Sequence, residues 1–72
     1  MDPVDREFLA RVAHDVRAPL TSIKGYVGLL LEGAFGDLTQ EQIQILGLVM
    51  NNADRIEALV IEIGDRVEPP EE

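Results

Sequence analysis

Two long segments of the chain carry apolar residues at steps of three and four, the spacing that lines them along one side of an α-helix. The pattern predicts helices over residues 3–33 and 40–67, joined by a loop at 34–39 and followed by a linker stub at 69–72. The first stripe consists of Leu9, Val12, Ala13, Val16, Leu20, Ile23, Val27, Leu30 and Ala34. The second consists of Ile43, Ile45, Leu46, Val49, Met50, Ala53, Ile56, Leu59, Val60, Ile63 and Val67.

The residues that flank these segments are typical of helix ends. Asp2–Pro3 suits a helix start, because Asp accepts hydrogen bonds from unpaired N–H groups and Pro has no N–H to lose at the first helical position. Gly33 and Gly36 mark the end of the first helix. Thr39 and Gln42 have the spacing of a capping box, which predicts a second start near residue 40.

Two helices of about 28 to 30 residues joined by a short loop are expected to fold back as an antiparallel hairpin, so the predicted class is all-α. On a helical wheel the apolar positions of the second helix spread over roughly 200°, more than one neighbouring helix can cover. A chain of 72 residues without cysteine also lacks disulfides to stabilise it. We therefore expect a homodimer in which two hairpins form a four-helix bundle.

Composition argues against several classes of protein. Fourteen acidic residues against six basic ones give a formal charge of −8, the wrong sign for binding nucleic acid or an anionic membrane surface. The longest uncharged run, residues 42–53, is too short to span a bilayer, which needs about 20 apolar residues. With no cysteine and one histidine, we expect no metal site.

The single histidine lies outside the apolar stripe. His14 is roughly 140° from the centre of the stripe on the helical wheel, so its imidazole is predicted to face solvent. An accessible neutral imidazole is a competent nucleophile near pH 7. A carboxylate that reaches the opposite ring nitrogen would orient the ring and stabilise the positive charge formed during attack. Asp15 is the candidate for that carboxylate, and an ordinary solvated acid is the alternative.

The stretch "FLARVAHDVRAPLTSIKGY" resembles the H-box of sensor histidine kinases. The loop "GAFGDLTQEQ" and the segment "ADRIEALV" are similar to the helix connection and second helix of the same family, so the resemblance covers nearly the whole chain. It implies the dimerisation and histidine phosphotransfer domain. The positions that fit the H-box are His14, Asp15, Val16, Arg17, Pro19, Leu20, Ile23, Gly25 and Tyr26.

The resemblance implies that His14 receives the γ-phosphoryl group of ATP from a separate catalytic domain and passes it to an aspartate of a response-regulator receiver domain. Asp15 would act as base, and Arg17 would either balance phosphate charge or be an ordinary surface cation. Pro19 would bend the helix below His14, because it cannot donate to the carbonyl of Asp15. ATP and Mg²⁺ would bind only the catalytic domain, because this chain has no glycine-rich nucleotide loop.

The expected regulator-docking positions lie below the histidine on the outer side of the first helix. Ala18 departs from the family pattern. It occupies the place of the usual Thr or Asn, whose side chain is expected to orient the hydrolytic water. A weak regulator phosphatase is therefore expected. The resemblance also implies a cytoplasmic location, either free or within a membrane-bound sensor. The docking positions are Ala18, Thr21, Ser22, Gly25, Tyr26 and Leu29.

Two other functions stay open from the sequence. A dimeric interaction module with an inactive histidine would have the same helices and transfer no phosphate. A stand-alone phosphotransfer protein would accept phosphate only from a regulator. The chain is predicted to be inactive with ATP alone in all three cases, because it lacks a nucleotide-binding domain.

Overall fold

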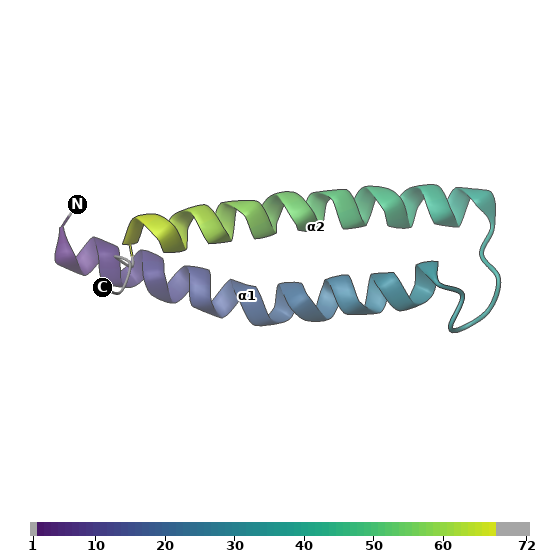
Figure 1. Cartoon of the computed structure of the whole chain (residues 1–72), viewed down its shortest axis with the longest axis horizontal. Helices are drawn as coiled ribbons and strands as arrows, with labels where there is room; N and C mark the ends of the chain where they lie inside the picture. The colour runs from purple at the N-terminus through teal and green to yellow at the C-terminus, as the bar shows by residue number, and fades with distance from the viewer. Residues whose placement is uncertain (1, 68–72) are drawn as a thin grey trace.

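The computed structural model describes residues 2–67 as two antiparallel helices (Figure 1). Helix α1 spans Pro3–Leu31 and helix α2 spans Gln40–Val67. The molecule is a rod of 49 × 20 × 17 Å, with the connecting loop at one end. The predicted all-α hairpin is confirmed. The expected linker stub at 69–72 lies outside the described residues.

Helix α1 begins as the sequence predicts and ends slightly earlier. The carboxylate of Asp2 accepts a hydrogen bond of 3.0 Å from the N–H of Val4. At the other end Gly33 has a φ of 80°, a left-handed conformation that favours glycine. The N–H groups of Gly33 and Ala34 donate to the carbonyls of Leu30 and Leu29, the pattern of a Schellman motif. Ala34, predicted to continue the apolar stripe, is therefore exposed beyond the helix.

A capping box starts helix α2. The backbone N–H of Thr39 donates to Oε1 of Gln42 at 2.8 Å, and the N–H of Gln42 donates to Oγ1 of Thr39 at 3.1 Å. These reciprocal bonds satisfy two N–H groups that would otherwise lack partners at the start of the helix. The chain therefore turns sharply from loop to helix at this point.

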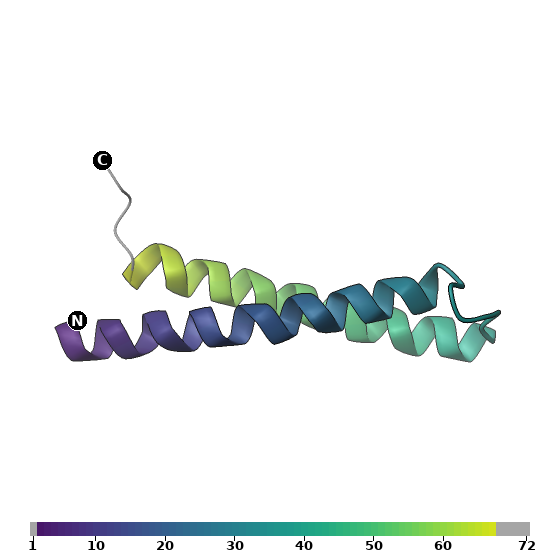
Figure 2. The ribbon, with the colours of Figure 1, turned by 90° about the horizontal axis from the view of Figure 1, so that it is seen from below.

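The core between the helices is narrow. One row of side chains from each helix is buried, and the members of each row are seven residues apart. This spacing matches a seam between two helices that cross at a shallow angle, as Figure 2 shows. The buried residues are Ala13, Leu20 and Val27 on α1, and Ala53, Val60 and Val67 on α2.

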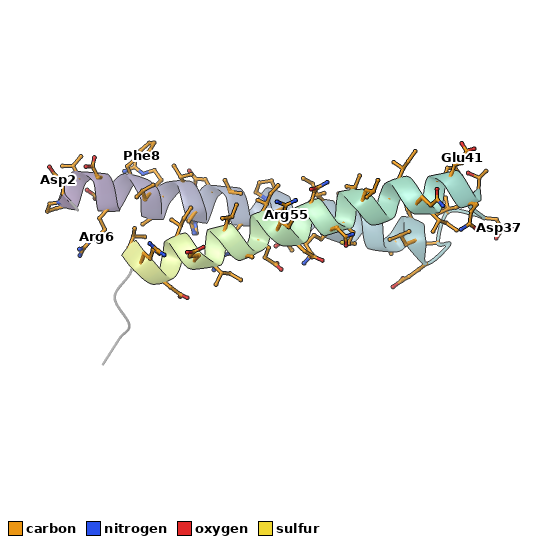
Figure 3. All side chains as sticks on the ribbon, turned by 90° about the horizontal axis from the view of Figure 1, so that it is seen from above. Asp2, Arg6, Phe8, Asp37, Glu41 and Arg55 are labelled. Carbon is orange, nitrogen blue, oxygen red and sulfur yellow. The ribbon has the colours of Figure 1, made fainter. Side chains whose placement is uncertain are left out.

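Many other apolar residues of both stripes stay exposed in the single chain. Ile23 retains 47% of its accessible surface and Ile56 retains 44%, although each lies near the helix interface. The N-terminal turns of α1 extend beyond the end of α2, and Phe8 projects there away from α2 (Figures 1 and 3). Within residues 2–67, neither helix has the apolar length required to cross a bilayer. One hairpin thus leaves much of its apolar surface uncovered.

Candidate phosphoacceptor site

His14 lies in the N-terminal half of α1, one residue after the buried Ala13. Its side chain is exposed, as the helical wheel predicts. The neighbouring side chains one turn away on the same side are small or flexible, since Ala10 and Ala18 flank His14 at four residues in each direction. A large partner can therefore approach the imidazole from solvent.

Asp15 is exposed on the next position of the helix and lies on a different side from the imidazole. Its side chain lines a shallow apolar hollow together with Val16, Pro19 and Ile56. No hydrogen bond between His14 and Asp15 occurs among the described residues. The carboxylate would need another rotamer to reach the ring, so the role of Asp15 as base stays a prediction.

Pro19 lies inside α1, and the helix continues through it. The ribbon of α1 changes direction near its middle (Figure 1). Proline removes the hydrogen bond to the carbonyl four residues earlier, here that of Asp15, and this favours a bend. The hydroxyl of Thr21 also donates to the carbonyl of Arg17 at 3.0 Å, a side-chain bond that often accompanies helix bending. The bend therefore lies within a turn or two of His14.

The predicted docking positions form a continuous exposed surface on α1 below His14. Tyr26 retains 67% of its accessible surface and Leu29 retains 40%. A Cβ atom built on Gly25 meets no atom within 4 Å, so a partner backbone can approach closely here. Because these positions share one helix, their spacing relative to His14 is fixed by the helix itself. All the docking positions are exposed: Ala18, Thr21, Ser22, Gly25, Tyr26 and Leu29.

Arg17 extends from α1 toward α2. One of its terminal nitrogens, Nη2, lies 3.9 Å from the position that a Cβ atom on Gly64 would occupy. No ion pair joins Arg17 to a carboxylate among residues 2–67. Sequence reasoning missed this contact, because the relative register of two helices is not visible in the pattern of either one.

Lys24 makes the ion pairs that link the two helices in the described part of the chain. Its Nζ lies 2.8 Å from Oδ1 of Asp54 and 2.9 Å from Oε1 of Glu57. Hydrogen bonds to Asp54 and then to Glu57 raise the pKa of Lys24 above its ordinary value of 10.5. Sequence reasoning also missed this cluster. A signal was available, since Lys24 is a charged residue at the edge of an apolar stripe.

The side chains of residues 2–67 include no group of three or more His, Cys, Asp or Glu placed to hold a metal ion. What they do present is an exposed imidazole, a carboxylate at the next position, an arginine one turn away and a bend in the helix on the loop side of the histidine.

Comparison with known proteins agrees with this geometry. Residues 5–66 match the model of the His Kinase A (phospho-acceptor) domain. The circadian input-output histidine kinase CikA of Synechococcus elongatus is 36% identical over 59 residues, which cover 82% of this chain and 8% of that protein. The sensor protein GacS of Pseudomonas syringae pv. syringae is 36% identical over 62 residues, covering 86% of this chain and 6% of GacS.

The sensor protein kinase WalK of Staphylococcus aureus is 38% identical over 60 residues, covering 81% of this chain and 14% of WalK. The chain thus spans only a small part of the length of these relatives. No solved structure gives a significant match to the chain. The family match over residues 5–66, together with the exposed histidine on a helical hairpin, shows that this chain belongs to the His Kinase A (phospho-acceptor) domain family of sensor histidine kinases.

Proposed function

We propose that His14 is the phosphoacceptor of this domain, that it receives the γ-phosphoryl group of ATP from a separate catalytic domain, and that it passes the group to a receiver-domain aspartate. The observation that carries this proposal is the position of His14. It is the one histidine of the chain, and it is exposed on α1 within a domain of the phosphoacceptor family.

The chemistry requires only a ring nitrogen with a free lone pair. That nitrogen forms a bond to the γ-phosphorus, the bond from the phosphorus to the β,γ-bridging oxygen breaks, and the electron pair leaves with ADP. The proton on the other ring nitrogen is then lost to a base, for which Asp15 is the nearest carboxylate along the chain. In the second transfer a carboxylate oxygen of the regulator forms the new bond to phosphorus, the phosphorus–nitrogen bond breaks, and its electron pair returns to the imidazole, which regains a proton. ATP and Mg²⁺ would be held by the catalytic domain.

The domain works as a homodimer in this proposal. The hollow beside Asp15 is lined almost entirely by apolar side chains, among them Val12, Ile23 and Ile56. A second hollow near the loop is lined by Leu30, Leu38 and residues of α2. Covering both with a second copy would bury the apolar surface that one hairpin leaves exposed, which is the main driving force for such association. The result is a four-helix bundle with two His14 side chains on its outside.

The receiver domain is proposed to dock on the outer surface of α1 below His14, from Ala18 to Leu29. This surface combines an open approach at Gly25 with exposed apolar contacts at Tyr26 and Leu29. Apolar and aromatic anchors of this kind carry most of the binding energy at many protein interfaces. A cytoplasmic location belongs to the same proposal, because phosphoryl transfer from ATP requires access to the cytoplasmic nucleotide pool.

A phosphorylation assay with a matched variant tests the function. The chain is mixed with the catalytic domain of a sensor histidine kinase and γ-labelled ATP, in parallel with His14→Gln. We expect label in the native chain, in an acid-labile and alkali-stable form, and none in the variant. Adding a receiver domain should then move the label to the receiver.

The same assay separates the alternatives. Label that appears only when a phosphorylated receiver is supplied would support a stand-alone phosphotransfer protein. If no donor labels the native chain, although it is folded and dimeric, the domain is an interaction module with an inactive histidine. Label that persists in His14→Gln would refute the assignment of His14.

A further inference from the structure

Arg17 and Lys24 occupy equivalent places on α1, seven residues apart and therefore two turns along the same side of the helix. Both reach toward α2. Lys24 meets two carboxylates there, those of Asp54 and Glu57, at 2.8 and 2.9 Å. Arg17 and Lys24 are thus two cations on one side of α1 that extend toward the neighbouring helix.

Glu57 on α2 lies opposite Lys24, and Gly64 on α2 lies opposite Arg17 in the same way. Because the helices are antiparallel, a step of seven residues back on α1 pairs with a step of seven residues forward on α2, from Glu57 to Gly64. The contact observed between Arg17 and Gly64, at 3.9 Å from the ideal Cβ position, agrees with this register. Within residues 2–67, no carboxylate therefore completes a second interhelical ion pair at Arg17, one turn from His14.

Neither backbone conformation nor crowding requires a glycine at position 64. The positive-φ glycines among the described residues are Gly33 and Gly36, so Gly64 has an ordinary helical conformation. A Cβ atom there would make only an ordinary van der Waals contact with Arg17. Glycine is among the least favourable residues inside a helix. The distinguishing property of Gly64 is that it has no side chain, so the side chain of Arg17 can lie against it without meeting a charged group there.

We infer that Gly64 is a positioning residue for the phosphoacceptor, because it leaves the guanidinium of Arg17 without a carboxylate partner among residues 2–67 and able to turn to the phosphoryl group on His14. This inference rests on the proposed function. Arg17 follows His14 by three residues, so the two side chains are neighbours on the helix surface. A guanidinium binds phosphoryl oxygens through two parallel N–H bonds. The ion pair made by Lys24 shows what a carboxylate at position 64 would do to Arg17.

The test is a pair of substitutions that differ only in charge. Gly64→Glu places a carboxylate opposite Arg17, whereas Gly64→Gln places an uncharged side chain of the same size there. Purified chains are treated with phosphoramidate, a small phosphoryl donor that needs no catalytic domain. The imidazole nitrogen forms the bond to phosphorus, the phosphorus–nitrogen bond of the donor breaks, ammonia leaves, and the proton on the other ring nitrogen passes to solvent. Phosphorylation of His14 is followed by ³¹P NMR.

We expect Gly64→Glu to slow phosphorylation of His14 about tenfold, the size of effect expected when a hydrogen bond to a charged group is lost. Gly64→Gln should react at nearly the native rate. Arg17→Gln should be as slow as Gly64→Glu, and the double variant Arg17→Gln with Gly64→Glu should be no slower than either. In the native chain the Nε resonance of Arg17 should shift on phosphorylation, and Gly64→Glu should shift it beforehand.

Each result bears on one proposal. Equal rates for Gly64→Glu and Gly64→Gln in folded chains would overturn the role of Gly64. An unchanged rate of His14 phosphorylation in Arg17→Gln would also overturn the role of Gly64. This measurement remains informative even if Gly64→Glu fails to fold. Failure of the native chain to be phosphorylated at His14 by phosphoramidate and by a catalytic domain would instead refute the proposed function.

Discussion

The ammonium group of Lys24 lies 2.8 Å from Oδ1 of Asp54 and joins α1 to α2 five residues below Pro19. Glu57, one turn further along α2, accepts a second bond from the same ammonium at 2.9 Å. Lys24 is half-buried at the seam between the helices. The cluster therefore fixes the register of the hairpin on the loop side of the bend, at the level of the docking surface.

Lys24 should make the stability of the hairpin depend on pH in the alkaline range. Hydrogen bonds to Asp54 and Glu57 raise the pKa of Lys24 in the folded state. A raised pKa means that the stabilisation is fully present below the unfolded-state value of about 10.5 and is lost as pH rises through the folded-state value. Urea unfolding at pH 8 and at pH 11.5 should therefore show a larger loss for the native chain than for Lys24→Met. Parallel losses in the two chains would contradict this role.

Ile56→Glu should dissociate the dimer. Ile56 lines the apolar hollow beside Asp15, so the substitution would place an unpaired carboxylate in the proposed interface. We expect dimer affinity to fall on the order of 100-fold, measured by sedimentation equilibrium across micromolar concentrations. Leu29→Asp is the control, because Leu29 lies on the outer surface and its substitution should leave the dimer intact. A native chain that sediments as a stable, folded monomer would refute the dimer itself.

Leu29→Asp should weaken transfer to the regulator. The exposed Leu29 side chain is a proposed apolar anchor for the receiver domain, and an aspartate there cannot fill the same contact. Transfer from phosphorylated His14 is expected to slow about tenfold at limiting receiver concentration. Phosphorylation of His14 by the catalytic domain should not change. Native transfer rates at every receiver concentration would remove Leu29 from the docking surface.

Ala18 should make this domain a poor regulator phosphatase. Its methyl group, four residues after His14 and exposed, can neither donate nor accept a hydrogen bond to orient a hydrolytic water. Ala18→Thr is expected to accelerate decay of the phosphorylated receiver several-fold without changing phosphorylation of His14. The measurement compares receiver decay with no added protein, with the native dimer and with the variant. Strong acceleration by the native dimer would refute this expectation.

The sequence predicted the features that depend on one helix at a time. The three- and four-residue spacing placed both helices, and the pairing of Thr39 with Gln42 located the start of α2. The same spacing put His14 on the exposed side. Ala34 was misplaced, because its apolar character fitted the stripe while the left-handed conformation of Gly33 had already ended the helix.

The features that depend on both helices were not predictable from the pattern. Lys24 meets Asp54, and Arg17 meets Gly64, only in one register of α1 against α2. That register is set by how the narrow row of buried residues packs, which includes alanines as well as larger side chains. Shifting one helix by a turn would leave each stripe apolar and change both contacts.

The two helices are covalently joined only by the loop at one end of the hairpin, and their other ends are not joined (Figures 1 and 2). When the crossing angle of two such helices changes slightly, each residue is displaced by an amount that grows with its distance from the loop. The Lys24 cluster also joins the two helices, so only the part of α1 beyond it can move freely relative to α2. His14 lies ten residues beyond Lys24 toward the open end, or about 15 Å along the helix. A slight rotation of α1 therefore moves the imidazole of His14 sideways further than it moves the docking surface, which lies nearer the loop.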